Sequence, residues 1–102
     1  MVAVLEDKRA AIVQACVRFG VARLEVFGSA LRDDFRPGES DLDLLVQFEA
    51  MHPHDLVDAY FGLLEELRKV LAVEIDLVMA DAVKNRFIAA DIERTKQPLY
   101  AA

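Results

Sequence analysis

Hydrophobic and polar residues follow two different periodicities along this chain, and together they predict a mixture of helices and strands. Residues 4–19 place their apolar side chains at helical spacing, and Gly20 is suited to end that helix. Residues 22–27 form a short segment that ends in a β-branched and an aromatic residue, which favours a strand. A Gly-Ser turn follows, and Ser29 is positioned to cap a short helix through Phe35.

Two later segments, residues 41–48 and 73–79, alternate with a period of two, as strands do. In the first, one face carries Leu42, Leu44, Val46 and Phe48, and the other carries Asp41, Asp43, Leu45 and Gln47. In the second, Val73, Ile75, Leu77 and Met79 alternate with Glu74, Asp76 and Val78. Each strand is therefore expected to bury one face and to turn its acidic residues to the other. If the strands are neighbours at the usual spacing of about 4.8 Å, Asp43 and Asp76 can reach one metal ion.

An amphipathic helix is predicted between these strands, because apolar residues from Leu56 to Leu71 recur on one helical face. A last helix is predicted over residues 82–94; Pro98 prevents its continuation, and residues 99–100 are expected to return to the body. The predicted order is α-β-α-β-α-β-α. This order predicts an α+β fold, an α/β sandwich in which helices flank a small sheet, but it does not give the strand directions.

Length and charge limit the classes of function. A chain of 102 residues predicts a single domain over residues 1–102, and 55% apolar residues suffice for a core. The net charge of −6 argues against general nucleic-acid binding, which needs a basic face. A small nucleotide stays open, because metal ions can neutralise its phosphates locally. An acidic surface also suits docking on a basic protein partner.

The cysteine count and the absence of long apolar runs indicate the compartment. The single cysteine, Cys16, excludes an internal disulfide, and its place on the apolar side of the first helix predicts a buried thiol. The N-terminus lacks the basic and apolar regions of a signal peptide. No apolar run approaches the roughly 20 residues that span a bilayer. We therefore expect a cytoplasmic protein that makes no membrane contact.

Three acidic residues and a Gly-Ser turn carry the candidate chemistry. Mg²⁺ prefers oxygen ligands, and two such ions about 4 Å apart can bind both the attacking and the leaving oxygens of a phosphate transfer. Asp41 and Asp43 supply carboxylates two residues apart, and Asp76 supplies a third from another apolar run. Gly28 permits close backbone approach to a phosphate, and the hydroxyl of Ser29 can donate a hydrogen bond.

Ordinary structural explanations stay open for the same residues. The Gly-Ser turn could simply end in a helix-capping serine, and Asp41 could begin a solvated strand. Asp76 could pair with Arg32 or Arg23. Arg32 could equally reach a phosphate, since it lies one turn after the Gly-Ser pair. Ser40 either stabilises the loop before the acids or contacts the nucleotide.

The motif as a whole is Gly-Ser, then Ser-Asp-x-Asp, then a later strand Asp, within residues 27–46 and 73–79. Together with the ending Gln97-Pro98-Leu99-Tyr100, it resembles the minimal nucleotidyltransferases of the DNA polymerase beta superfamily, the antitoxin halves of HEPN/MNT toxin–antitoxin pairs. The resemblance implies a mixed sheet, two Mg²⁺ ions and ATP as substrate. It also implies the site. Gly28 and Ser29 would bind the triphosphate, with Arg32 and Ser40 nearby. Asp41 and Asp43 would bind the metal ions that hold the triphosphate, and Asp76 would bind the catalytic metal ion and act as the base.

The resemblance also implies the function. It predicts transfer of AMP from ATP to a tyrosine hydroxyl of a cognate HEPN ribonuclease toxin, which silences the toxin. A second hypothesis is a binding antitoxin that masks its partner sterically without catalysis, although masking alone has no need of three clustered acids. A third is transfer of a nucleotide to a small molecule such as an aminoglycoside, but those enzymes usually carry a further domain for the acceptor.

Overall fold

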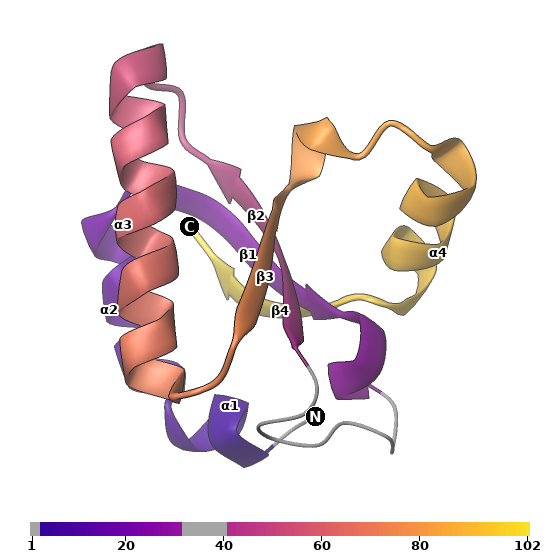
Figure 1. Ribbon diagram of the computed structural model, residues 1–102, viewed down its shortest axis with the longest axis horizontal. Coiled ribbons are helices and arrows are strands. Elements are labelled where there is room, and N and C mark those ends of the chain that lie inside the picture. The colour runs from indigo at the N-terminus through magenta and orange to yellow at the C-terminus, as the bar shows by residue number, and fades with distance from the viewer. Residues whose placement is uncertain (1–2, 32–40) are drawn as a thin grey trace.

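The computed structural model of this protein describes residues 3–31 and 41–102, and it places helices on both faces of a four-stranded sheet (Figure 1). The elements, in chain order, are α1 (Ala3–Asp7), α2 (Arg9–Arg18), β1 (Val21–Phe27), the short 3₁₀ helix η1 (Gly28–Leu31), β2 (Leu42–Phe48), α3 (Pro53–Leu71), β3 (Ile75–Met79), the 3₁₀ helix η2 (Ala80–Ala82), α4 (Arg86–Thr95) and β4 (Gln97–Ala101). Helices α2 and α3 cover one face of the sheet, and α4 lies over the other (Figure 1).

The sheet is mixed, and its strand order is β3-β2-β1-β4. Strand β1 runs antiparallel to both β2 and β4, whereas β2 and β3 are parallel. The parallel pair requires a crossover, and α3 supplies it along one face. The predicted α+β class, with a small mixed sheet flanked by helices, is confirmed.

The main hydrophobic core lies between the sheet and α2 with α3. The predicted inward faces are confirmed: Leu42, Leu44, Val46, Ile75 and Leu77 are all buried there. Four residues of α3 pack against them at helical spacing, namely Ala59, Leu63, Leu67 and Leu71. Cys16 is fully buried in the same core, as predicted, and burial raises the pKa of its thiol to about 12. The thiol is therefore a packing group that stays protonated at neutral pH.

The N-terminal helix differs from its prediction. One helix was expected over residues 4–19, but the chain forms α1 and α2 with a turn at Lys8 between them. The break lets Leu5 and Ile12 both reach the core, and each is almost completely buried. Within the described residues, no helix is both long enough and apolar enough to cross a membrane.

The C-terminal part also differs. Helix α4 begins at Arg86 and not near residue 82, because the side chain of Asn85 accepts hydrogen bonds from the backbone N–H groups of Phe87 (2.9 Å) and Ile88 (3.2 Å) and caps the helix. After α4 the chain forms a fourth strand, β4, at the edge of the sheet. Pro98 is tolerated in β4 because an edge strand has one side on which a missing N–H does not break the ladder.

Candidate active site

The end of β1 brings the backbone of Gly28 against an acidic side chain of β2. In the β1–β2 ladder, Phe27 is paired with Asp43, so the next residue turns away beside that carboxylate. Gly28 has φ +72°, and a Cβ at this position would lie 2.3 Å from Oδ2 of Asp43. A larger residue would therefore collide with the acid as well as strain the backbone. Glycine is therefore required at this position, whereas its predicted role at a phosphate stays a prediction.

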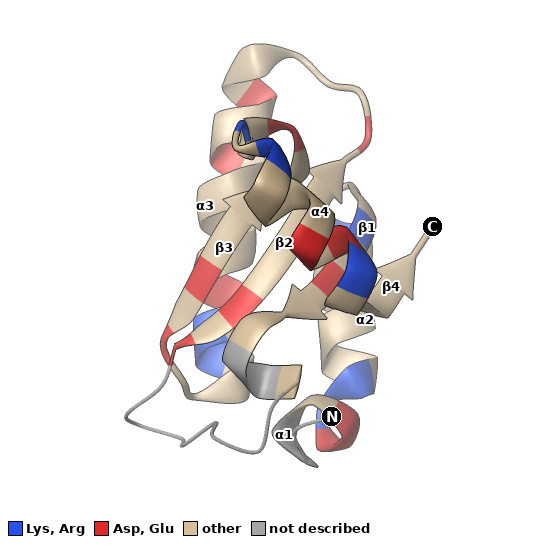
Figure 2. Cartoon of the chain, turned by 90° about the vertical axis from the view of Figure 1, so that its right-hand side faces the viewer, with Lys and Arg blue, Asp and Glu red and all other residues tan. Residues whose placement is uncertain are grey.

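Asp43 and Asp76 are directly paired in the parallel ladder of β2 and β3. Because paired positions of neighbouring strands share a face, both carboxylates lie on the side of the sheet away from α3. Figure 2 shows acidic positions side by side on these two strands. Asp43 is half-buried and Asp76 is exposed at the sheet edge. The predicted neighbourhood of these two acids is confirmed.

Asp41 stands slightly apart from this pair. It is exposed and lies just before β2, whose first backbone N–H, on Leu42, donates a 2.9 Å hydrogen bond to the carbonyl of Glu74. By strand alternation Asp41 shares the side of Asp43, but it lies about 6–7 Å further along the chain. In residues 3–31 and 41–102, no group of three or more His, Cys, Asp or Glu side chains is arranged to hold a metal ion.

The predicted metal site fits this arrangement in part. The two carboxylates at paired positions offer the oxygen donors that Mg²⁺ prefers. Like charges at paired positions also cost free energy, which a divalent cation would offset. The donor chemistry thus fits the ion at Asp43 and Asp76. The full set of Asp41, Asp43 and Asp76 stays a prediction.

Three other predicted residues are not placed by the structure. Arg32 and Ser40 lie outside the described residues, as does the side chain of Ser29. The backbone of residues 28–31 forms η1, so the turn after β1 begins as a 3₁₀ helix. The roles of these three residues on the nucleotide stay predictions.

Glu74 does not share the site with Asp76, although strict alternation placed both on one face. It precedes the first residue of β3, and its carboxylate lies 3.8 Å from the guanidinium of Arg68 on α3. Both side chains are largely exposed, so this ion pair is weak. Glu74 is thus peripheral to the paired acids.

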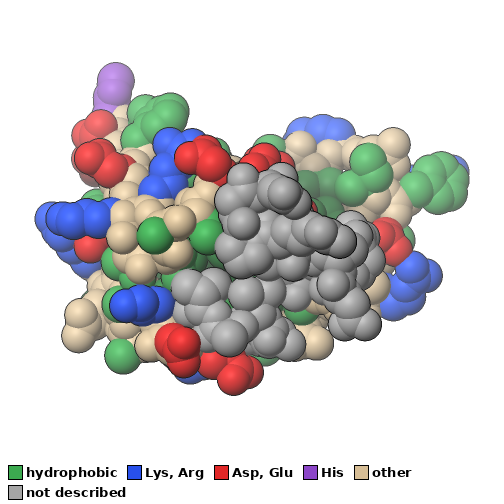
Figure 3. Space-filling model, turned by 60° about the horizontal axis from the view of Figure 1, so that its bottom comes forward, with side chains coloured by type: hydrophobic (Ala, Val, Ile, Leu, Met, Phe, Trp, Pro, Cys, Tyr) green, Lys and Arg blue, Asp and Glu red, His purple; other side chains and the backbone are tan. Residues whose placement is uncertain are grey.

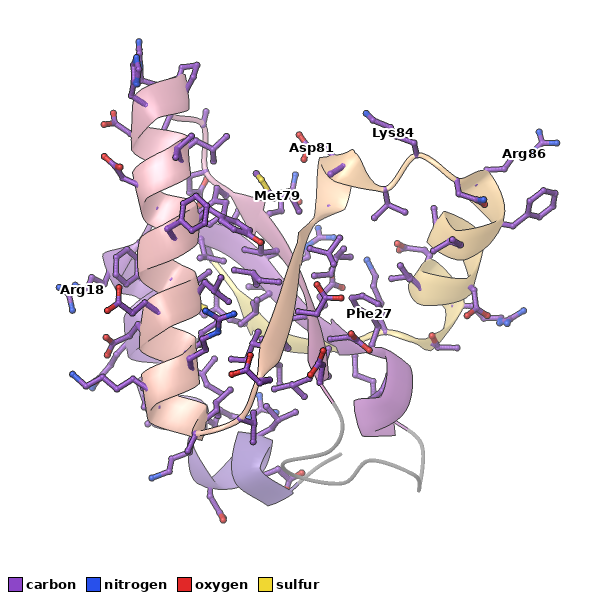
Figure 4. All side chains as sticks on the ribbon, viewed as in Figure 1. Arg18, Phe27, Met79, Asp81, Lys84 and Arg86 are labelled. Carbon is purple, nitrogen blue, oxygen red and sulfur yellow. The ribbon has the colours of Figure 1, made fainter. Side chains whose placement is uncertain are left out.

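A cavity of about 670 Å³ opens beside the acids, between the sheet and α4. Gly28, Leu31 and Asp43 line it from the sheet side, and Ile88, Asp91 and Thr95 line it from α4. Phe27, also in its wall, lies on the side of the sheet that faces α4 (Figure 4). The volume falls in the usual range of small-molecule pockets, roughly 300–1,000 Å³. The cavity is large enough for a nucleotide, and Asp43 is the predicted site acid that lines it.

Sequence reasoning missed the contribution of α4 to this cavity. The signal available was the apolar content of α4, because Phe87 and Ile88 exceed what a core-facing stripe needs. Both side chains are indeed exposed, at 75% and 54%, and of the α4 residues only Ile92 is buried. Apolar residues that do not serve the core are candidates for contact with a ligand or partner.

A second charged cluster holds α4 against the sheet, and it was also missed. The ammonium of Lys96 lies 3.0 Å from Oε1 of Glu25 on β1 and 2.8 Å from Oε2 of Glu93 on α4. Burial lowers the pKa of Lys96, but hydrogen bonds and attraction from Glu93 and Glu25 outweigh it, and the net shift is upward. The sequence signal for this cluster was Glu25, an acidic residue within the otherwise apolar second half of β1.

The surface around these clusters carries both signs of charge. On the face shown in Figure 3, acidic and basic side chains are interspersed over the described part of the chain. The paired acids are therefore distinguished by their position in the strand ladder and by the cavity beside them, and not by a broad electrostatic field.

Comparisons with known proteins agree with this geometry. Residues 9–99 match the nucleotidyltransferase domain family. A protein adenylyltransferase MntA from Thermococcus cleftensis is 40% identical over 68 residues, which are 67% of this chain and 65% of that protein. A Methanocaldococcus jannaschii protein, provisionally named a protein adenylyltransferase, is 34% identical over 76 residues, 74% of each chain.

Solved structures show the same fold. A structure provisionally described as a minimal nucleotidyltransferase is 33% identical, with a TM-score of 0.77, and the match covers 92% of this chain and 91% of that one. A toxin–antitoxin structure with AMP-PNP (16% identity, TM-score 0.67) covers 92% of this chain and 73% of its own. A structure of a tri-AMPylated Shewanella oneidensis HEPN toxin in complex with MNT antitoxin matches at 15% identity with a TM-score of 0.61. The match covers 96% of this chain and 73% of that one.

The class that the fold and the acids define is a transferase of nucleotidyl groups. The chain belongs to the nucleotidyltransferase domain family, among its minimal members, as the motif of residues 27–46 and 73–79 predicted.

Proposed function

We propose that this protein transfers AMP from ATP to a tyrosine hydroxyl of a cognate HEPN toxin and thereby neutralises the toxin. The observation that carries the proposal is the direct pairing of Asp43 with Asp76, with the backbone of Gly28 against the first of them. The relatives named protein adenylyltransferases support AMP as the transferred group. The shared fold of toxin–antitoxin complexes supports a HEPN partner.

The phosphates of ATP would lie between the start of η1 and the paired acids. Gly28 leaves room for the triphosphate to approach the backbone, and Ser29, Arg32 and Ser40 are proposed to donate to its oxygens. Mg²⁺ bound by Asp43 and Asp76, with Asp41 as a further ligand, would supply neutralisation of the phosphate charge. The cavity under α4 would receive the nucleoside.

Asp76 is placed to serve the acceptor. Its carboxylate is exposed on β3, so a hydroxyl group on another protein can approach it from solvent. In the proposed step Asp76 accepts the proton of the tyrosine hydroxyl while the tyrosine oxygen bonds to the α-phosphorus. The bond from that phosphorus to the bridging oxygen breaks, and pyrophosphate leaves. Positioning and charge neutralisation carry most of the rate in such transfers.

One experiment separates this function from steric masking. The protein is incubated with its cognate HEPN toxin, ATP and Mg²⁺, and the toxin is then isolated under denaturing conditions and refolded. Covalent transfer predicts that the toxin gains the mass of one AMP unit or a multiple of it, on tyrosine. It also predicts that the toxin stays inactive after this protein has been removed.

Matched variants make the experiment decisive. Asp76→Asn should abolish the added mass, whereas Glu74→Gln, two residues away, should not, since Glu74 faces Arg68. Full recovery of toxin activity with no added mass would favour the masking hypothesis. So would complete neutralisation by the Asp76→Asn protein while the toxin stays unmodified.

A further inference from the structure

An apolar groove lies between α3 and β3, outside the cavity that was assigned to the nucleotide. Its volume is about 450 Å³, and its lining includes Val57, Tyr60 and Phe61 from α3 and Leu77 and Met79 from β3. Figure 4 shows Met79 in the space between α3 and the end of β3. Val57 is 55% exposed and Phe61 is 61% exposed, so α3 turns two large apolar side chains to solvent at this groove. Clustered exposed apolar residues of this kind mark interaction surfaces.

The groove and the paired acids share strand β3. Asp76 immediately precedes Leu77, and the groove-lining residues of β3, Leu77 to Met79, lie about 3–10 Å from it along the chain. The carboxylate of Asp76 lies on the side of the sheet away from α3, so a protein seated in the groove would reach it around the edge of β3. Since β3 is at the edge of the described sheet, such a protein meets no further strand on its way to that carboxylate.

Side-chain insertion fits the groove better than strand addition. An open sheet edge invites pairing with a strand of another chain. Here the hydroxyl of Tyr60 donates a 2.5 Å hydrogen bond to the carbonyl oxygen of Leu77 on that edge. One edge carbonyl is thus already satisfied from α3, and the floor of the groove is apolar.

The charges around the groove select the partner. Asp58 and Glu65 are exposed and flank Phe61 at i−3 and i+4 on α3, where side chains are neighbours. Within residues 3–31 and 41–102 neither of these carboxylates is in an ion pair. Two nearby cations already have partners: Arg68, at i+7 from Phe61, lies 3.8 Å from Glu74, and Lys84 donates to the carbonyl of Asp81. The charged residues that flank Phe61 at these two spacings are therefore both acidic.

These two acids argue against a second copy of the chain as the occupant. A two-fold dimer through the groove would bring Asp58 and Glu65 towards their own equivalents, on chains that each carry −6. A protein with an apolar or aromatic side chain surrounded by Lys or Arg would bury that side chain in the groove and would also attract Asp58 and Glu65. We infer that the groove is the docking site of the acceptor protein, with its apolar side chain against Phe61 and its basic residues against Asp58 and Glu65. The inference rests on the proposed function for the identity of that protein.

Docking is tested separately from transfer. Association of this protein with its cognate HEPN toxin is measured by calorimetry without nucleotide, for wild type, Phe61→Glu and the control Val17→Glu. Val17 is a matched control because it is 64% exposed on α2, away from the groove. Phe61→Glu should weaken association at least about tenfold, as loss of an aromatic interface anchor does, while Val17→Glu stays within about twofold of wild type. The rise in melting temperature on adding ATP and Mg²⁺ should be unchanged in both.

Four outcomes decide the inference. Wild-type affinity of Phe61→Glu, or no association of the wild-type protein with the toxin, would overturn it. A wild-type dimer in sedimentation that Phe61→Glu dissociates would show that the occupant is a second copy; Glu65→Lys should weaken toxin binding but would strengthen such a dimer. Docking through Phe61 with no AMP transferred would retain the inference and refute the proposed function.

Discussion

Two clusters of carboxylates lie on the same face of this sheet, and they are built in opposite ways. At the first, Glu25 and Glu93 surround the ammonium of Lys96, whose side chain is only 11% exposed. At the second, Asp43 and Asp76 are set at directly paired positions of two strands, next to a cavity. The first cluster carries its own cation and fastens α4 and β4 to β1. The second sets two carboxylate oxygen donors at neighbouring positions, an arrangement that suits a divalent cation.

The comparison teaches that acidic residues on one face can be sorted by what they are paired with. A carboxylate that meets an internal lysine contributes to stability, and removing it should leave chemistry intact. A carboxylate set beside another at paired strand positions is suited to hold a cation, and removing it should affect chemistry first. The following changes test whether the two clusters really divide in this way.

The largest effect is expected from Asp76→Asn set beside Glu25→Gln. Both changes replace a carboxylate by an amide of similar size. Asp76→Asn should lower AMP transfer by about 10³-fold or more, because it removes the proposed base and a ligand charge, and it should leave the melting temperature close to wild type. Glu25→Gln should lower the melting temperature and keep most of the activity. Transfer of radiolabel from ATP and thermal unfolding measure the two effects; the reverse result would refute the division.

Loss of Lys96 should be the largest change in stability. Lys96→Met leaves the buried carboxylate of Glu25 without its cation and should lower the free energy of unfolding by about 2 kcal/mol. Because the pKa of Lys96 is raised above 10.5 in the folded protein, its contribution is complete below that pH and is lost as pH rises through the raised value. Denaturant unfolding of both proteins from pH 8 to 11 should show the difference constant at first and shrinking above 10.5. A difference that grows with pH would contradict this assignment.

Two glycines allow the contact with Asp43 to be isolated from backbone strain. Gly28 and Gly20 have φ values of +72° and +70°, so alanine should cost about 1–2 kcal/mol at either position. Their surroundings differ, because a Cβ at Gly20 meets only the flexible end of Met51 at 3.1 Å. Gly28→Ala should therefore also weaken ATP binding, while Gly20→Ala should not. Calorimetric titration with ATP and Mg²⁺ measures the difference, and equal affinities would argue against a nucleotide at this turn.

The smallest effect is expected from Glu74→Gln. Its ion pair with Arg68 is exposed and 3.8 Å long, so its loss should change the free energy of unfolding by less than about 0.5 kcal/mol. AMP transfer should stay near the wild-type rate. A large loss of activity would mean that Glu74 belongs to the active site together with Asp43 and Asp76.

The predictable parts of the fold were those governed by local periodicity. Alternation placed Leu42, Leu44 and Val46 in the core and turned Asp43 outward, and the spacing of apolar residues located α3. The fourth strand was not predicted because Pro98 argues against a strand. A proline fits a strand only where one side has no neighbouring strand, as at the edge of the sheet. Edge position is a property of the whole sheet and not of the local sequence.

The candidate site was predictable to a similar degree. The pairing of Asp43 with Asp76 followed from two alternating strands once they were taken as neighbours. Glu74 was expected on the face of Asp76 but peripheral to the site, and its ion pair with Arg68 on α3 agrees with a peripheral position. The roles of α4 and of Lys96 could not be predicted, since they depend on where a helix packs after the chain has crossed the sheet.

The parallel pairing of β2 with β3 has a consequence for how the protein acquires activity. Asp43 and Asp76 meet only after the 19 residues of α3 have formed and crossed the sheet, and Gly28 joins them through a separate ladder. Such non-local contacts form late in folding because the chain between them must first be closed. A nascent or partly folded chain would contain helices but no assembled acids. Recovery of nucleotide binding after dilution from denaturant should therefore lag behind recovery of the helical circular dichroism signal. ATP with Mg²⁺ should stabilise only the fully folded protein and not the partly folded chain.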